Sequence, residues 1–327
     1  MKNGKITDTV LKRSVLSVLS HRHPGVIKPP NTGEDCSVIE DGDDYIVMST
    51  DPITGATEDV GRLSVHVTVN DLASSGAEPV GVLLSILLPE GTKESALKSM
   101  MEDAEAAAEE CGIDILGGHT EITPAVNRVI ITATGIGRAD KLRLTPTSGA
   151  RSGDSLVLTK WVGLEGTSII AKEKREQLMN RLPEALVTEA SRFDRYMSVL
   201  PEARVAASLG AHAMHDVTEG GIFGALWEIA EASGLGVTAD IRKIPIRQET
   251  VEICEFFDIS PYLLISSGSM LIAIPDGETL VLALEKEGIH SAVIGRMTPE
   301  KNRRIVHMDE TDRVLTEPEP DELYKVI

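Results

Sequence analysis

Four short acidic segments in the first half of the chain each place a carboxylate beside the expected end of a strand or helix. They are Gly33-Glu34-Asp35, Thr50-Asp51-Pro52, Val69-Asn70-Asp71-Leu72 and Gly117-Gly118-His119-Thr120-Glu121. Mg²⁺ keeps several waters and is usually held by one or two carboxylates plus the phosphates of a substrate. Together the segments predict a metal-phosphate site with Asp35, Asp51 and Asp71 as ligands, although any one of them alone could be an ordinary surface aspartate.

Composition limits the kinds of partner that the chain can bind. Its 327 residues are too many for one typical core and fit two domains. Lys and Arg total 32 against 51 Asp and Glu, a net charge of −19, which disfavours nucleic acid and anionic membranes as partners. No apolar run approaches the roughly 20 residues of a membrane span, and residues 1–8 lack the apolar core of a signal peptide. We therefore expect a cytoplasmic protein.

Apolar periodicity predicts a mixed α/β chain in two parts. In the first part we expect helices over residues 7–19, 60–75 and 94–110 and strands over 36–39, 45–50, 80–88, 113–116 and 129–136. In the second part we expect helices over 166–174, 186–197, 201–209, 223–233, 246–257 and 278–287, and strands over 154–159, 212–214, 236–240, 269–274 and 292–296. Residues 141–153 contain Pro146, Ser148, Gly149 and Gly153 and little apolar periodicity, so we place the domain boundary there, giving domains 1–148 and 149–327. Residues 316–327 are expected to form a solvated tail.

Several common site motifs are absent from the sequence. There is no P-loop and no complete Gly-x-Gly-x-x-Gly after a strand, so neither of these nucleotide sites is supported. The Gly-x-Ser-x-Gly elbow of serine hydrolases is also missing. Cys36, Cys111 and Cys254 are widely spaced and odd in number, which indicates buried, reduced packing residues rather than a disulfide framework or a zinc site.

Longer motifs in the chain resemble a known superfamily. They are Asp51 after Met48-Ser49-Thr50, residues 59–73 with Gly76-Ala77-Glu78-Pro79, residues 117–121, and His215-Asp216-Val217-Thr218-Glu219-Gly220-Gly221. Together they resemble the aminoimidazole-ribonucleotide synthetase (PurM-like) superfamily over nearly the whole chain, most closely its HypE family of hydrogenase maturation proteins. The resemblance implies an α/β (α+β) fold of two domains. The N-terminal domain would bind ATP and Mg²⁺ and extend its sheet into a barrel across a homodimer, and the C-terminal domain would be an α/β sandwich.

The resemblance also implies roles for individual residues. Asp35, Asp51 and Asp71 would be metal or phosphate-proximal carboxylates, with Asn70 supporting Asp71 through a hydrogen bond. Gly117 and Gly118 would form a tight turn whose amides approach phosphate, and His119, Thr120 and Glu121 would follow it at the nucleotide. Asp216, Thr218, Glu219, Gly220 and Gly221 would form a turn that opens a helix and binds an anion, unless Asp216 and Thr218 are only helix caps. His119 and His215 are candidate acid or base groups, with a buried hydrogen-bonded role as the alternative.

The function that the resemblance implies is ATP-dependent transfer of the γ-phosphoryl group to an oxygen of a small substrate. His119 stands where HypE proteins usually have Asp, and Cys254 is the last cysteine, whereas HypE proteins end in a cysteine that they modify. We therefore do not assign the HypE self-modification reaction. A small-molecule kinase similar to thiamine-monophosphate kinase is one alternative, and a non-catalytic nucleotide-binding assembly protein is another. A homodimer, a small-molecule acceptor and a maturation partner protein are the expected partners.

Overall fold

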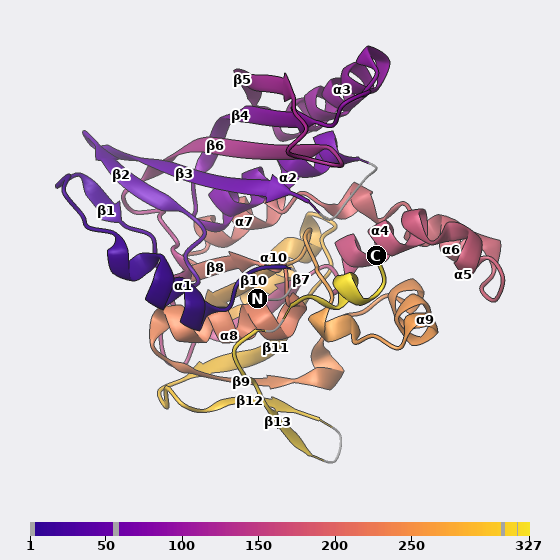
Figure 1. Cartoon of the computed structure of the whole chain (residues 1–327). Coiled ribbons are helices and arrows are strands. Elements are labelled where there is room, and N and C mark those ends of the chain that lie inside the picture. Colours follow the sequence, from indigo (N-terminus) through magenta and orange to yellow (C-terminus); the bar gives the residue numbers. More distant parts are fainter. Residues whose placement is uncertain (1–3, 55–58, 309–310, 319) are drawn as a thin grey trace.

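Two β-sheets, one in each half of the chain, form the framework of the protein (Figure 1). The computed structural model describes residues 4–54, 59–308, 311–318 and 320–327. The first sheet has six strands in the order β1-β2-β3-β6-β4-β5. Its strands are β1 (Val26–Lys28), β2 (Ser37–Asp41), β3 (Asp44–Ile53), β4 (Glu78–Leu88), β5 (Asp114–Ile122) and β6 (Ile130–Asp140).

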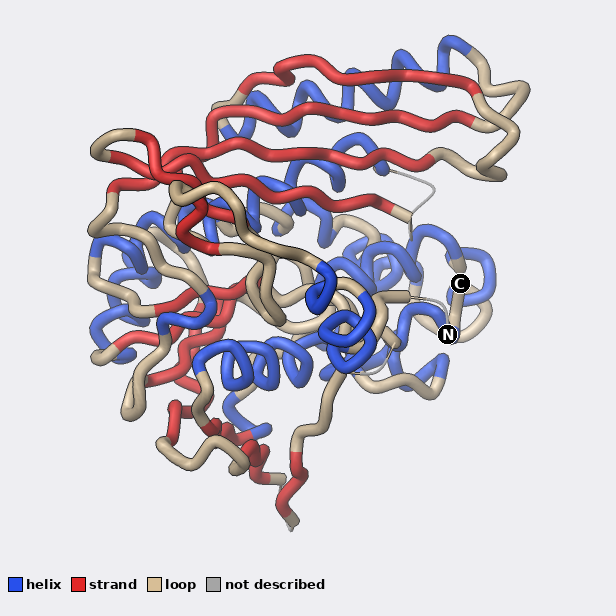
Figure 2. The backbone as a smooth tube through the Cα atoms, turned by 60° about the vertical axis from the view of Figure 1, so that its left-hand side comes forward, coloured by secondary structure: helices blue, strands red, loops and turns tan. Residues whose placement is uncertain are grey.

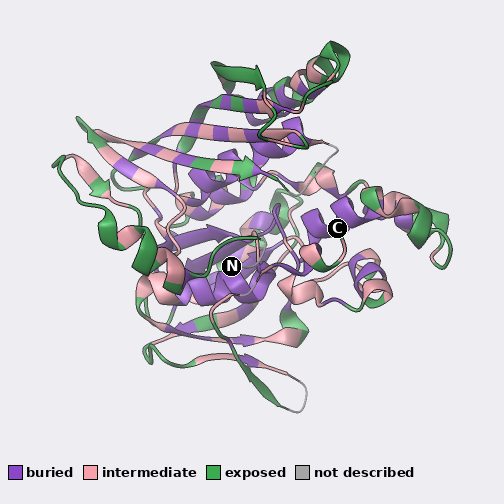
Figure 3. Ribbon diagram, in the orientation of Figure 1, coloured by how far each residue is buried: buried purple, intermediate pink, exposed green. Residues whose placement is uncertain are grey.

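Two long helices, α2 (Val60–Ser74) and α3 (Glu94–Cys111), cover one face of this sheet (Figure 2). Strand β6 alternates between buried and partly buried residues, as expected for a strand with one covered face. Helix α3 ends at Gly112, whose φ of +69° is the left-handed conformation typical of a residue that follows a helix. Strand β5 is the free edge of the sheet and is exposed along almost its whole length (Figure 3).

The second sheet has seven strands in the order β13-β12-β9-β11-β7-β10-β8. Its strands are β7 (Ser155–Thr159), β8 (Ala213–Asp216), β9 (Gly236–Asp240), β10 (Met270–Ile274), β11 (Ser291–Thr298), β12 (Arg304–His307) and β13 (Asp312–Val314). Every residue of β8 and β10 is buried, so this sheet is covered on both faces where these strands lie. Helix α8 (Gly221–Ser233) packs on one face, and α7 (Leu200–Ser208) and α10 (Gly277–Lys286) pack on the other.

Shorter elements complete the second half and join it to the first. They are α1 (Asp8–Ser14), α4 (Leu164–Glu173), α5 (Arg175–Leu178), α6 (Glu184–Ala190) and α9 (Gln248–Phe257). Helix α2 lies between the first sheet and the second half, where it contacts α7 and β8, and one hydrophobic core runs through this junction. The mixed α/β fold with two sheets is therefore as expected. The predicted boundary at residue 148 falls in the connection between β6 and β7 and stays a prediction.

Segments near both ends of the described chain lie against the second half. Thr9 donates its backbone N–H to Glu317 Oε1 at 2.6 Å, and Lys12 Nζ bonds Glu231 Oε1 of α8 at 2.7 Å. The prediction of a solvated tail at 316–327 was wrong, because Asp321 and Leu323 are only 2% and 3% exposed. The charged and proline-rich composition of this segment concealed an apolar contact. No helix among the described residues is long and apolar enough to cross a membrane.

Candidate active site

A cavity of about 650 Å³ opens between the two halves of the molecule. From the first half it is lined by Asp35 beside β2, by the end of β3 and by α2. From the second half it is lined by the start of α4, by the loop before α8 and by the segment after Leu264. Its described lining residues are Gly4, Lys5, Asp35, Asp51, Pro52, Ile53, Thr54, Val67, Asp71, Arg128, Glu165, Thr218, Glu219, Ile265, Ser267, Tyr324 and Ile327.

Four aspartates gather at this cavity. Asp35, Asp51 and Asp71 line it, and ligand atoms of Asp35, Asp216 and His215 all lie within 4.8 Å of one another. Burial raises the pKa of Asp71 well above its ordinary value, and the charges of Asp216, Asp51 and Asp35 raise it further. Burial and the charge of Asp35 raise the pKa of Asp216 to about 7. The carboxylates of Asp71 and Asp216 are therefore buried with too little positive charge beside them.

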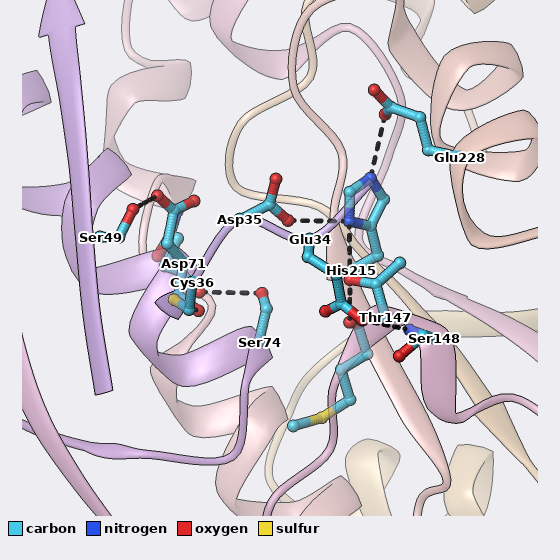
Figure 4. Close-up of polar contacts among 12 residues, drawn as sticks. Glu34, Asp35, Cys36, Ser49, Asp71, Ser74, Thr147, Ser148, His215 and Glu228 are labelled. Carbon is cyan, nitrogen blue, oxygen red and sulfur yellow. Dashed lines mark hydrogen bonds and ion pairs between the residues drawn. The ribbon is translucent and has the colours of Figure 1, made fainter. Parts of the chain in front are cut away.

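The aspartate cluster fits a hard divalent cation. Both carboxylate oxygens of Asp216 are buried and have no hydrogen-bond partner among the described residues. A buried carboxylate without a partner is costly, and a metal ion is one of the few groups that can offset that cost. Asp71 already accepts a hydrogen bond from Ser49, which leaves one of its oxygens free of that contact (Figure 4). Carboxylate oxygens from Asp35, Asp51, Asp71 and Asp216 are suited to Mg²⁺.

A line of alternating charges runs from Asp35 through His215 to Glu228 (Figure 4) and continues to Lys5. His215 Nδ1 lies 3.0 Å from Asp35 Oδ2, and His215 Nε2 lies 3.1 Å from Glu228 Oε2. Lys5 Nζ lies 3.0 Å from Glu228 Oε1. Burial alone would lower the pKa of His215, but Asp35 and Glu228 outweigh it and hold that pKa well above its ordinary value. Burial alone would raise the pKa of Glu228, but Lys5 and His215 lower it to about 2.

This geometry gives His215 a positioning role. The imidazole is 2% exposed and both ring nitrogens face carboxylates, so it holds Asp35 in place rather than reaching into the cavity. The buried hydrogen-bonded alternative is therefore the one that the arrangement favours over an acid or base group at neutral pH. Thr147 Oγ1 is a further neighbour, 3.3 Å from His215 Nδ1.

Asn70 does not support Asp71 as predicted. Its Nδ2 donates to Met197 O at 2.8 Å, and its Oδ1 accepts from the N–H of Val199 at 2.9 Å. The side chain is fully buried and ties α2 to the second half of the chain. Ser49, on the neighbouring strand β3, makes the hydrogen bond to Asp71 that was expected of Asn70.

Gly117 and Gly118 do not form a tight turn. They lie inside β5 and pair with Leu83 and Leu84 of β4. A Cβ on Gly118 would come 1.9 Å from Leu84 O, and its φ is +146°, so glycine is needed there for strand pairing. His119, Thr120 and Glu121 follow on the same exposed edge, where His119 Nε2 lies 3.1 Å from Glu121 Oε2. These five residues are absent from the described lining of the cavity.

The predicted anion site before α8 is occupied from within the chain. Thr218 and Glu219 do line the cavity, but the N–H of Gly220 donates to Asp321 Oδ2 at 2.8 Å. The N–H of Gly221 donates to Thr218 O at 3.0 Å. A carboxylate of the protein therefore takes the place at this helix start that was predicted for a phosphate. Asp216, at the end of β8, belongs to the aspartate cluster instead.

The comparisons with known proteins agree with this architecture. Residues 33–139 match the N-terminal domain model of AIR synthase related proteins, and residues 151–307 match the C-terminal domain model. The carbamoyl dehydratase HypE of Cupriavidus necator is 30% identical, with 80% of this chain and 76% of that protein covered. The chain belongs to the AIR synthase related protein family. Within this superfamily it is close to HypE.

Other members of the family match over nearly the full length. A putative hydrogenase expression/formation protein of Methanocaldococcus jannaschii is 28% identical, with 99% of this chain and 97% of that protein covered. A crystal structure of a HypE-HypF complex matches with a TM-score of 0.78 and 22% identity, covering 94% of this chain and 99% of that chain. A structure of the hydrogenase maturation protein HypE in complex with ATP matches with a TM-score of 0.72 and 21% identity, covering 100% of this chain and 98% of that one. At these identities the structural matches establish the PurM-like fold.

Sequence reasoning missed several residues of the site. Lys5, Arg128, Glu165 and Tyr324 line the cavity but belong to no motif that the sequence singles out. The charge of Glu228 is equally hidden, because it lies within an apolar helix pattern. Only the fold shows that Glu228, seven residues after Gly221 on α8, lies beside His215 of β8.

Proposed function

We propose that this chain is a HypE-like, ATP-dependent enzyme that transfers the γ-phosphoryl group of ATP to an oxygen of a small acceptor, with Mg²⁺ as its metal. The observation that carries the proposal is the aspartate cluster, in which buried Asp216 has two unpartnered oxygens beside Asp35. The cluster adjoins a cavity of about 650 Å³, within the usual range for small-molecule sites. The ATP complex of the related HypE structure supports a nucleotide as the ligand.

The residues around the cavity divide the work of phosphoryl transfer. Asp35, Asp51, Asp71 and Asp216 would hold the metal, which when bound neutralises and orients phosphate oxygens. Lys5 and Arg128 line the same cavity and bring positive charge to phosphates. His215 orients Asp35 and is itself held by Glu228. In such reactions the protein contributes chiefly position and charge.

Calorimetry of ATP binding with and without Mg²⁺ tests this function. We expect Mg²⁺-dependent binding to the wild-type protein and its loss in Asp71→Asn. Asp103→Asn, at an exposed position on α3, is the matched control and should bind normally. Absence of ATP binding by the wild-type protein contradicts the proposal. ATP binding without turnover in a screen of acceptors favours the non-catalytic assembly protein, and turnover with thiamine monophosphate favours the small-molecule kinase.

We also propose that the protein works as a homodimer joined along β5, which would extend the first sheet toward a barrel. Leu116 and Ile122 on this edge strand are 48% and 60% exposed, and Val80 and Leu83 of β4 are 44% and 39% exposed. An unpaired strand edge with exposed apolar side chains favours pairing with another chain. The HypE-HypF complex among the structural neighbours supports a maturation protein as a further partner.

A further inference from the structure

A side pocket of about 60 Å³ adjoins the main cavity and shares Pro52, Glu165 and Tyr324 with its lining. Its walls combine apolar side chains, among them Ile53, Ile169 and Ile265, with three carboxylates, Glu165, Glu219 and Asp321. No Lys, Arg or His is among its described lining residues. A pocket of this size leaves room for a small head group of a few atoms.

Two of the three carboxylates are already used by the protein. Glu219 accepts from the N–H of Lys5 at 2.9 Å and from the hydroxyl of Tyr324 at 2.8 Å. Asp321 accepts from the N–H groups of Gly220 and Leu323, both at 2.8 Å. These contacts fix the loop before α8 and the segment at 321–324 as walls of the pocket, and they leave neither carboxylate as the open acceptor.

Glu165 is the carboxylate that remains open. It lies in the first turn of α4, is 5% exposed, and lines both the side pocket and the main cavity. Its Oε2 is buried and has no hydrogen-bond partner among the described residues. Burial raises its pKa to about 7, although contacts from Ser267 offset part of that shift. A carboxylate this buried and unpaired is costly unless a ligand supplies the missing donor or charge.

We propose that Glu165 binds the acceptor substrate of this enzyme through a protonated nitrogen, so that the acceptor is an organic cation carrying an ammonium or amidinium group. The inference rests on the proposed function. Phosphates belong in the main cavity, at the metal that Asp35 and Asp71 would hold, because the side pocket has three carboxylates and no cationic side chain among its described lining residues and therefore repels anions. The cationic head group fills the side pocket, and its apolar stem lies against the isoleucines. The rest of the acceptor extends into the main cavity, which Asp35, Asp51 and Asp71 also line.

Three small probes of similar size test the charge preference of the pocket. They are n-propylammonium, butyramide and butyrate, added to the full-length protein with Mg²⁺ and ATP and followed by saturation-transfer NMR. We expect propylammonium to bind at least about tenfold more tightly than butyramide, and butyrate not to bind. Glu165→Gln should weaken propylammonium binding about tenfold or more. Glu285→Gln, an exposed site on α10, is the control and should leave it unchanged.

The remaining outcomes overturn the inference. Equal binding of the amide and the amine, or full amine binding in Glu165→Gln, excludes a cation site at Glu165. Weaker ATP binding in Glu165→Gln with unchanged amine binding assigns Glu165 to the nucleotide base. Displacement of the amine when Mg²⁺ is raised to a millimolar excess over ATP assigns Glu165 to a metal. If Glu165→Gln unfolds, Glu165→Asp replaces it in the test. This variant shortens the side chain by one methylene, and it should also weaken propylammonium binding. Mg²⁺-dependent ATP binding measured in the same samples tests the proposed function separately.

Discussion

The aspartate cluster and the edge strand β5 carry the two main groups of residues that the sequence singled out, and the structure treats them in opposite ways. Asp35, Asp71 and Asp216 come from distant parts of the chain and meet around one cavity. His119 and Glu121 stay on an exposed strand, paired with each other. The aspartates therefore form a site within a single chain. His119 and Glu121 can contribute to a binding site only if a second molecule packs against β5.

Replacing Asp216 is expected to have the largest effect, because it tests directly whether the aspartate cluster binds a metal. We expect Asp216→Asn to reduce Mg²⁺-dependent ATP turnover roughly 10²–10³-fold, because a metal ligand is lost. The same change should raise the melting temperature of the metal-free protein, since it removes a like charge from the cluster. Turnover assays and thermal unfolding in EDTA measure the two effects. A drop in both would mean that Asp216 serves only the fold.

A change on β5 tests whether the second group acts through a partner copy. Ile122→Asp places a charge on the exposed edge. If the proposed dimer forms along β5, this variant should be monomeric in light-scattering measurements while the wild-type protein is dimeric. If His119 and Glu121 contribute to the partner's nucleotide site, turnover should fall about tenfold or more along with the dimer. Leu282→Asp, at an exposed position on α10, is the control. A monomeric variant with full activity would show that the edge strand lies outside the site.

Asn70 separates a structural role from a role in binding. Asn70→Ala removes two buried hydrogen bonds between α2 and the second half, which should lower the free energy of unfolding by about 1–3 kcal/mol. Since Asn70 does not line the cavity, the KM for ATP of the folded variant should change less than about twofold. Urea unfolding and steady-state kinetics give the two values. A large rise in KM with unchanged stability would restore the predicted support of Asp71.

The cluster also makes stability depend on pH. Asp216, whose pKa rises from 3.8 to about 7 on folding, and Asp71 bind protons more tightly in the folded state. Stability from such groups is present at low pH and is lost as pH rises between about 4 and 7. His215, with its raised pKa, changes in the same sense, and Glu228, with a pKa near 2, is constant above pH 5.

We therefore expect the free energy of unfolding in EDTA to fall by about 1–3 kcal/mol between pH 5 and 7.5. Asp216→Asn should flatten this dependence, and Mg²⁺ should stabilise the wild-type protein more at pH 7.5 than at pH 5. Urea unfolding at the two pH values measures the change. A rise in stability toward pH 7.5 in EDTA would contradict the repulsion within the cluster.

How far the sequence predicts the site depends on whether neighbours in sequence stay neighbours in space. Asp35, Asp51 and Asp71 were predicted together because Asp35 and Asp51 stand near the ends of expected strands and Asp71 lies in the helix that follows them. Asp216 was given to an anion-binding turn, since no periodicity shows that the end of β8 meets Asp35. Glu165 was missed because its importance comes from burial and from the absence of a partner, which sequence does not display.

The edge strand shows the same limit for backbone. Gly117 and Gly118 have the residue type of a tight turn, and only the close approach of Leu84 reveals that their small size serves strand pairing instead. The fold class could be predicted more fully, because apolar residues recur at helical spacing along segments as long as α2 and α3.

The pair of hydrogen bonds made by Asn70 has a consequence for how ligands enter and leave. Met197 and Val199 hold α2 from the far side, so swinging the two halves apart would leave buried amide groups unpaired. Lys5 and Tyr324 at the rim bond the carboxylate of Glu219 in the loop before α8. Lys5 also bonds Glu228, and Asp321 of the segment at 321–324 accepts from Gly220. Because the rim contacts of Lys5 and Tyr324 are exposed or partly buried, whereas those of Asn70 are fully buried, we expect movement of the rim to be the lower-energy route by which a ligand enters and leaves.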